Sequence, residues 1–293
     1  MNLAAVIDET LITLPRGDEA ALDVALEKIS ELLSQLADDR VLRLKRSTIY
    51  ETEILPEIML MDVLFSGAVP LDGVVREGLV RQLDAIDDWD VDGEDGSSEG
   101  FAIARLSTGN PIACVVMERY AERLPGPPVL HRVAEYRGLL AFYREAIEIA
   151  DYDEPAYFRH AARAFPDLFF KPNIGTECRR FSEPYRAIRP VLTRALAALG
   201  DLLPLICKEH SDLRIIKTEF TAKSGFEISP DSPRTHQNKR AMRERDIFIN
   251  GVSLRCEWHL KLKPHVDRIY FNFGHNMSNN RIIVGILCDH LRT

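Results

Sequence analysis

Ionisable side chains recur at every second position near the C-terminal end of the chain. Alternate residues of a β-strand face the same side, so these groups would share one surface. Cleavage of RNA without a metal ion needs a base for the 2′-hydroxyl proton, cations for the charge on phosphorus and an acid for the leaving oxygen. This series supplies all three. The candidate catalytic residues are Glu257, His259, Lys261, Lys263, Arg268 and His290.

Within this set, either His259 or Glu257 would act as the base and His290 as the acid, while the lysines and Arg268 would stabilise charge. Two simpler interpretations compete with this one. Glu257 could form a surface ion pair with Lys261, and His259 could pack on the sheet without reacting. A zinc site is possible from strand spacing alone, but lysines in the same patch oppose a metal cation. We therefore expect neither a metal ion nor a cofactor.

The elements that would position these residues are short β-strands. Asn250-Gly251 is the dipeptide of a type I′ turn and predicts a β-hairpin. After the hairpin, apolar and polar residues alternate as far as Lys263, and a turn over residues 264–267 leads into a return strand that begins at Arg268. Pairing Lys263 with Arg268 aligns the apolar residues of both strands, so burial selects that register. Residues 281–288 begin with Arg281 and carry apolar residues on both strand faces, which is typical of a covered strand and completes a four-stranded antiparallel meander.

The run Trp258-His-Leu-Lys-Leu-Lys, a four-residue turn and Arg268-Ile-Tyr-Phe, followed by the apolar last strand, resembles the core of the RelE-type toxins. These are small ribosome-dependent mRNA endonucleases, and ParE and HigB-like toxins share their fold. The resemblance covers under a fifth of the chain. It implies basic functional positions at Lys261, Lys263, Arg268 and His290. His259 replaces a further family lysine and no late tyrosine follows, a departure that affects the expected reaction more than the fold.

The segment before the hairpin, residues 229–245, is polar, basic and broken by proline at its start. It predicts a loop or a short surface helix beside the sheet, where binding residues are common. Basic groups there would contact phosphates and so position a nucleic acid. The candidate nucleic-acid-binding residues are Arg234, His236, Lys239, Arg240, Arg243, Arg245, Tyr270 and Arg281.

Charge is distributed unevenly along the chain, whose net charge is −8. Residues 230–293 hold 11 Lys and Arg against 6 Asp and Glu, whereas residues 1–229 hold 26 against 39. A basic module joined to an acidic body is typical of nucleic-acid contact, with the acidic part shielding the site or facing a protein partner. Solvated faces that differ only in composition explain the charges equally well.

The overall pattern predicts an α+β protein with two parts. Residues 1–228 would form an acidic mixed α/β region that acts as sensor, partner or regulatory part, and residues 229–293 a basic RelE-like antiparallel domain. Helical spacing predicts helices over 20–36, 71–86, 131–150, 155–164 and 182–203. Strand character is expected over 40–50, 101–106, 111–117 and 213–228.

Asp88 to Glu99 matches the ligand positions of a calcium-binding loop. The motif normally has an apolar residue two positions after its glycine, where this chain has Asp95. We therefore favour a mobile acidic loop over a calcium site.

Cysteine usage and hydropathy bear on the cellular compartment. The five cysteines form no Cys-x-x-Cys pair, which favours reduced thiols. No run of eighteen apolar residues occurs and the N-terminus is acidic, so we expect a cytoplasmic protein without membrane contact. The function expected is metal-independent RNA cleavage or RNA binding, in bacterial stress or phage defence. The alternative is a non-catalytic nucleic-acid or protein-binding subunit of a defence complex.

Overall fold

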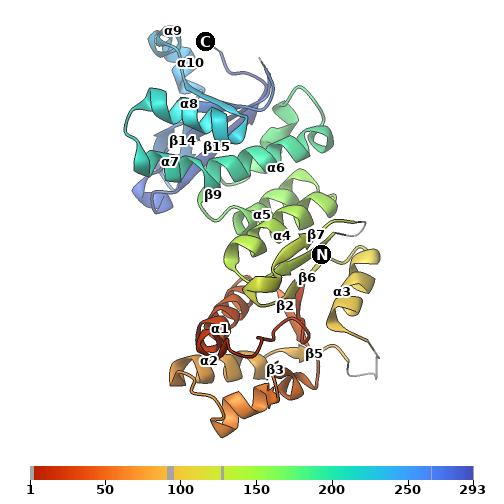
Figure 1. Cartoon of the computed structure of the whole chain (residues 1–293). Coiled ribbons are helices and arrows are strands. Elements are labelled where there is room, and N and C mark those ends of the chain that lie inside the picture. Colours follow the sequence, from red (N-terminus) through yellow and green to blue (C-terminus); the bar gives the residue numbers. More distant parts are fainter. Residues whose placement is uncertain (1–2, 91–95, 127–128, 265, 293) are drawn as a thin grey trace. The chain divides into compact units, whose positions relative to one another are not determined.

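The computed structural model describes residues 3–90, 96–126, 129–264 and 266–292 (Figure 1). The chain divides into two compact units, Met1–Ala146 and Ile147–Thr293, called unit 1 and unit 2 below. Both contain helices and strands, so the α+β class is confirmed. Along the chain, the boundary between the units falls between residues 146 and 147, whereas the sequence pattern suggested a boundary between 228 and 229.

Unit 1 contains a six-stranded sheet in the order β5-β2-β1-β6-β8-β7. Among these strands, β7 is antiparallel to its neighbour and the other pairs are parallel. Every residue of β1 and β6 is buried, as expected for strands covered on both faces. The strands are β1 (Ala4–Ile7), β2 (Leu42–Lys45), β5 (Asp87–Asp88), β6 (Ile112–Val115), β7 (Glu122–Leu124) and β8 (Leu130–Val133).

Helices cover this sheet, with α3 on one side and α1 on the other (Figure 1). On the α3 side, Ala102 packs with Val6 and Cys114 in one apolar cluster. The last helix, α4, continues across the boundary between the units. The helices are α1 (Leu22–Asp38), α2 (Gly73–Asp84), α3 (Ser98–Ser107) and α4 (Tyr136–Ile149), with short elements η1 (Glu19–Ala21), η2 (Ile49–Glu51), β3 (Glu53–Leu55), β4 (Ile58–Met59), η3 (Asp62–Ser66) and η4 (Glu118–Tyr120).

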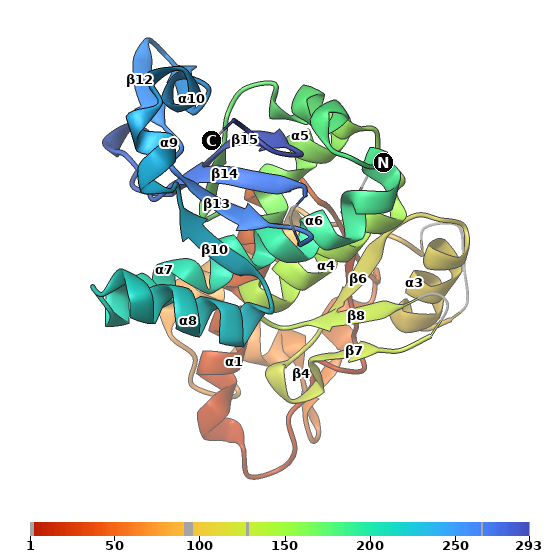
Figure 2. The same cartoon turned by 90° about the horizontal axis from the view of Figure 1, so that it is seen from above.

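Unit 2 is organised around a five-stranded sheet in the order β10-β13-β14-β15-β9. Figure 2 shows β10, β13, β14 and β15 side by side. β9 runs parallel to β15, and the other pairs are antiparallel. This corrects the expected four-stranded meander, because both edge strands come from upstream of the hairpin. The strands are β9 (Leu168–Phe170), β10 (Glu227–Pro230), β13 (Trp258–Lys261), β14 (Arg268–Asn272) and β15 (Ile282–Cys288).

The predicted hairpin forms, but it lies outside the main sheet as a two-stranded sheet of its own. β11 (Asp246–Ile249) and β12 (Val252–Arg255) pair around Asn250 and Gly251, whose φ angles of 50° and 80° are those of a type I′ turn. Ile247 and Cys256 then pack with Tyr270 and Ile286 on one face of the main sheet. The face predicted to be polar and solvated is therefore largely covered.

The helices of unit 2 include several that the sequence pattern assigned to the N-terminal region. Pro190 lies inside α6 without ending it. The helices are α5 (Glu154–Ala164), α6 (Tyr185–Asp201), α7 (Leu203–Glu209), α8 (Leu213–Ser224), α9 (Pro233–Gln237) and α10 (Lys239–Arg243), with η5 (Ile174–Arg180) and η6 (Asn276–Ser278).

Two strand predictions were wrong because helical spacing was missed. Residues 101–106 belong to α3, which Ser97 caps by accepting a hydrogen bond from the Gly100 amide. Residues 213–224 form α8, where Ile216 and Phe220 are buried one turn apart. Within the predicted helix 131–150, the first residues belong to β8 instead.

The stretch Tyr185–Glu209, which comprises α6 and α7, is long and apolar enough to cross a membrane by length and composition. Half of its most apolar 18 residues are buried inside the protein. Leu192, Leu196 and Leu199 of α6 are each fully buried. Packing within unit 2 therefore accounts for part of the apolar character of this stretch.

Candidate functional site

The strand pair β13 and β14 brings several of the predicted residues together. His259 lies opposite Tyr270, and Lys261 lies opposite Arg268. The predicted register, with Lys263 opposite Arg268, is wrong by two residues. A shift of two leaves every side chain on its original face, so the residues still share one side of the sheet. The shift matters because it sets a cation beside His259 on the neighbouring strand.

His259 occupies the buried part of this face. His259 is 6% exposed, and its Nε2 lies 3.0 Å from the hydroxyl of Ser229 on β10. The Nδ1 atom is buried and has no hydrogen-bond partner among the described residues. Burial, followed by the charges of Arg268, Lys261 and His290, lowers the pKa of His259 to about 3. The ring is therefore neutral at pH 7, and it becomes a stronger base only where a bound anion raises this pKa.

Arg268 and His290 complete a group that we call the His259 cluster: His259, Arg268 and His290. Arg268 is half-buried, and its Nε is buried without a partner among the described residues. His290 is exposed just beyond the end of β15. Burial and the charge of Arg268 lower the pKa of His290. The cluster combines two imidazoles with a guanidinium, which suits a bound anion.

The remaining predicted catalytic residues lie outside this cluster. Lys261 donates to Glu227 across the β10–β13 pair, at 2.6 Å. Lys263 forms an ion pair with Glu183. Glu257 is half-exposed, and its carboxylate lies 4.0 Å from Arg255. The simpler interpretation of Lys261, a surface ion pair, applies with Glu227 in place of Glu257.

Three predicted nucleic-acid-binding residues are used inside the fold. Arg245 is 1% exposed and binds Asp231 through two hydrogen bonds of 2.5 and 3.0 Å. Tyr270 is fully buried, and its hydroxyl accepts from the Leu291 amide at 3.2 Å. Arg281 donates to the backbone carbonyls of residues 166 and 278. Sequence reasoning missed Asp231, which lies fourteen positions before its partner and follows no local pattern.

The other predicted binding residues form an exposed rim on α9 and α10. Ser232 caps α9, and Asn238 caps α10 by accepting from the amides of residues 240 and 241. Within the described parts of the chain, no ion pair involves any of the rim cations. Unpaired exposed cations of this kind are the usual contacts of phosphate groups. The rim consists of Arg234, His236, Lys239, Arg240 and Arg243.

Unit 1 has a second feature of interest, at the carboxyl end of its sheet. The strand order reverses direction between β1 and β6, and ligands of open α/β sheets bind outside the carboxyl ends of strands at such a point. Asp8 follows β1 there and is fully buried. Thr10 binds its Oδ1, whereas Oδ2 has no partner among the described residues. Burial, with smaller effects of Glu9 and Glu99, raises the pKa of Asp8.

The groups around Asp8 are largely paired with one another. Glu9 accepts from the Ser98 amide and hydroxyl, and thereby caps α3. Glu99 accepts from Arg132 at 2.8 Å. Neither carboxylate reaches Asp8, which leaves its Oδ2 as the unsatisfied atom. Sequence reasoning did not identify Asp8, although an acidic residue directly after an apolar strand is a recognisable signal.

The predicted calcium loop lies partly outside the described residues, since residues 91–95 are not described. Its described acidic residues have other partners. Asp88 pairs with Lys45, and Asp90 accepts from the backbone and side chain of Ser47. Glu99 belongs to α3 and binds Arg132. These pairings explain the three acidic residues without calcium.

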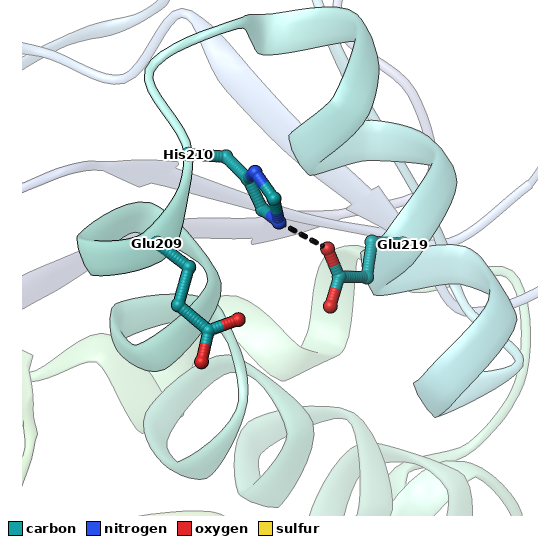
Figure 3. A group of neighbouring side chains, drawn as sticks. All are labelled: Glu209, His210 and Glu219. Carbon is teal, nitrogen blue, oxygen red and sulfur yellow. Dashed lines mark ion pairs between the residues drawn. The ribbon is translucent and has the colours of Figure 1, made fainter.

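A further cluster of potential ligands joins α7 to α8 (Figure 3). Glu209, His210 and Glu219 have ligand atoms within 4.8 Å of one another. The Nε2 of His210 lies 2.8 Å from Glu219, and Lys223 donates to the same carboxylate at 2.6 Å. Lys223 lowers the pKa of Glu219. The lysine already supplies the positive charge that a metal ion would bring, so we assign no metal to this cluster.

Comparison with known proteins adds no relative to this picture. No family model, curated protein or solved structure matches the chain. The resemblance to RelE-type toxins therefore depends on the residues between Trp258 and His290 alone, and it stays a prediction.

Proposed function

We propose that unit 2 is a ribonuclease of the RelE type that cleaves RNA without a metal ion. The observation that carries the proposal is the gathering of the His259 cluster around two unpaired buried nitrogens, Nδ1 of His259 and Nε of Arg268. A buried polar atom without a partner costs free energy. Phosphate oxygens are acceptors for Nε of Arg268, and their negative charge offsets the positive charge of this guanidinium. In the tautomer of His259 that donates Nε2–H to the Ser229 hydroxyl, Nδ1 is left free to accept a hydroxyl proton.

The chemistry follows from the protonation states in the cluster. His259 is neutral and accepts the proton of the 2′-hydroxyl, whose oxygen then attacks phosphorus. Arg268 stabilises the negative charge that develops on the phosphate oxygens. The bound phosphate raises the pKa of His290, which then donates a proton to the leaving 5′-oxygen. A cyclic phosphate and a free 5′-hydroxyl result, and no metal ligand is used.

The rim on α9 and α10 extends this site along an RNA strand. Its exposed cations would contact phosphates. For single strands, each such contact steepens the fall of the logarithm of the binding constant with the logarithm of the salt concentration by about 0.7. The RelE resemblance favours ribosome-bound mRNA in the cytoplasm as the substrate. Residues 1–228 would then provide contacts for a protein partner in stress or phage defence. A non-catalytic nucleic-acid or protein-binding subunit of a defence complex is the alternative.

Replacing Arg268 with glutamine should lower the rate of RNA cleavage about 100-fold, because one donor to the developing charge is lost. The rate would be measured on a short labelled RNA, with and without ribosomes and EDTA. Arg255→Gln is the matched control, since Arg255 is an exposed arginine of β12 paired with Asp246. It should cleave at the wild-type rate.

The pH dependence of RNA binding gives a second readout of the same site. A bound phosphate raises the lowered pKa of His290, so binding takes up a proton and the affinity should rise as the pH falls. His290→Ala should weaken this pH dependence. Equal cleavage by Arg268→Gln and Arg255→Gln would overturn the catalytic assignment. Binding by the wild type without cleavage under any condition would establish the alternative.

A second candidate function belongs to unit 1, and the unpaired Oδ2 of Asp8 favours it. A divalent cation at the carboxyl end of β1 would supply the missing partner and draw in Glu9 or Glu99 as a further oxygen ligand. Such a cation activates water for hydrolysis of phosphate esters. This activity would require metal, so EDTA separates it from the proposed activity of unit 2.

Replacing Asp8 with asparagine should stabilise unit 1 at neutral pH in the absence of metal. The folded pKa of Asp8 lies above the unfolded value, so this carboxyl group loses its contribution to stability as the pH rises through that range. Thermal unfolding would be followed with and without Mg²⁺ or Mn²⁺. The cations should raise the melting temperature of the wild type and of the exposed control Asp87→Asn, but not that of Asp8→Asn. An equal shift in all three would exclude the site.

A further inference from the structure

We propose that a pocket at the β9 edge of the unit 2 sheet binds one unpaired nucleotide, with the base against phenylalanine rings and the phosphate on Arg159. This inference deepens the proposed ribonuclease function, on which it rests for the identity of the ligand. The pocket lies apart from the His259 cluster, and none of the predicted catalytic residues lines it.

The pocket is formed by α5, β9 and η5 and has a volume of about 520 Å³. That volume is within the range of small-molecule sites in proteins. Its walls are mainly apolar, with basic groups around them. The residues that the argument uses are Phe158, Arg159, Phe169, Phe170, Lys171 and Arg281.

Aromatic rings make up one wall. Phe158 and Phe170 meet edge to face, with their ring centres 5.4 Å apart. Phe170 is only half-buried although it is large and apolar, because β9 is an edge strand of three residues. The ring of Phe169 packs on the other face of the sheet, against the apolar cluster of Ile247 and Tyr270. Unpaired RNA bases are recognised by stacking on phenylalanine rings and arginine planes. The wall therefore suits a planar base.

The basic groups of the pocket differ in whether they are already paired. Lys171 forms an ion pair with Glu177. Arg281 donates to two backbone carbonyls and lies over the ring of Phe169, 5.6 Å from its centre. Arg159 is exposed, and no hydrogen bond or ion pair holds it within the described chain. Arg159 is therefore the group available to a phosphate.

The pocket is held in shape by close packing of its walls. A Cβ on Gly175 would lie 2.7 Å from the carbonyl oxygen of Glu154 and 3.2 Å from the ring of Phe158. Only glycine allows η5 to approach α5 so closely. The ring of Phe158 is thus held in place before a ligand arrives, which lowers the entropy lost on binding.

The position of the pocket fits a strand of RNA that also reaches the His259 cluster. β9 is separated from β13 by β14 and β15, so the two strands lie three strand spacings, about 14 Å, apart across the sheet. An RNA strand that passes round the β9 edge to the other face must cover more than this distance, which takes at least about four stacked nucleotides. The pocket would then read one base upstream or downstream of the cleaved bond.

The test uses 2-aminopurine riboside 5′-monophosphate, a fluorescent nucleotide whose emission is quenched on stacking. Titration into the full chain should give saturable quenching. Arg159→Gln should weaken binding about tenfold, and so should removal of the phosphate from the probe. Ala162→Leu, a change at an exposed residue of the pocket lining, should weaken binding by narrowing the pocket. Arg194→Gln, an exposed arginine of α6, is the matched control and should bind as the wild type does.

Competition separates the ligand classes, and circular dichroism confirms that each variant is folded. The nucleotide assignment would be overturned if inorganic phosphate or phenylacetate displaced the probe as effectively as adenosine monophosphate does. It would also be overturned if Ala162→Leu bound the probe as tightly as the wild type. The titration is repeated in the His259→Ala, Arg268→Gln double variant, where binding should be unchanged. If the double variant quenches the probe and the wild type never cleaves RNA, the nucleotide pocket is supported and the ribonuclease function is rejected. If the wild type cleaves RNA but does not quench the probe, the ribonuclease function is supported and the nucleotide pocket is rejected.

Discussion

Replacing Asp231 with asparagine should lower the free energy of unfolding of unit 2 by about 3–5 kcal/mol, because it leaves a buried guanidinium without its counter-charge. Arg245 and Asp231 have side-chain exposures of 1% and 4%, and two hydrogen bonds join them. Arg245 also donates to the carbonyl of Ala241, so it cannot turn towards water without disrupting α10. Urea denaturation of the full chain would measure the loss.

Asp246 provides the control for this experiment. It also binds an arginine, Arg255, through two hydrogen bonds, but the side-chain exposures are 21% and 45%. Exposed pairs contribute about 0–1 kcal/mol, so Asp246→Asn should cost little. A double variant, Asp231→Leu with Arg245→Met, should recover much of the loss because no buried charge remains. If Asp231→Asn cost no more than Asp246→Asn, Arg245 would be free to act in RNA binding as the sequence suggested.

Replacing Gly285 with alanine should destabilise unit 2 by about 3 kcal/mol, at the upper end for overpacking of a core. The added Cβ would lie 2.8 Å from Cδ1 of Ile247 and closer still to Sγ of Cys256. Both atoms belong to the segment that lies across the sheet, so the hairpin β11–β12 must move away from β15. Chemical denaturation would give the stability, and hydrogen exchange of the β11 and β12 amides would show where the fold loosens.

Gly200→Ala is the matched control for Gly285→Ala. Its Cβ would meet Leu168 at 3.5 Å, an ordinary contact, and alanine is the better helix former within α6 by about 0.5–1 kcal/mol. Its stability should therefore stay the same or rise. Adding Cys256→Ala to Gly285→Ala should restore part of the loss by removing the closest atom. Equal stability of Gly285→Ala and the wild type would show that the hairpin is not held against the sheet at this point.

The same packing decides what the His259 cluster can do. The hairpin covers the middle of the face on which His259 and Tyr270 lie, and the backbone amide of Leu291 donates to the Tyr270 hydroxyl. A phosphate must therefore approach from the side of Arg268 and His290, which remain partly exposed. Variants that loosen the hairpin, such as Gly285→Ala, change this access as well as the stability.

Local signals in the sequence determined several elements of this protein. Asn250-Gly251 specified the type I′ turn, because those two residues accept positive φ with little strain. The helices α1, α2, α5 and α6 followed from apolar residues at helical spacing. Alternation along residues 257–263 also placed His259 and Lys261 on one face, a result that survives the shift of register because strand faces repeat every two residues.

Tertiary structure alone decided the rest, because those features join residues far apart in the chain. β9 and β10 add to the sheet from about a hundred and about thirty residues away, and no pattern in a single sequence encodes such pairings. Which cations stay free was also a tertiary outcome: Arg245 meets Asp231 and Lys261 meets Glu227, whereas the α9–α10 rim meets none in the described chain. Periodicity can assign a side chain to a face, but only the packed fold determines whether that face meets water, a partner or the hairpin.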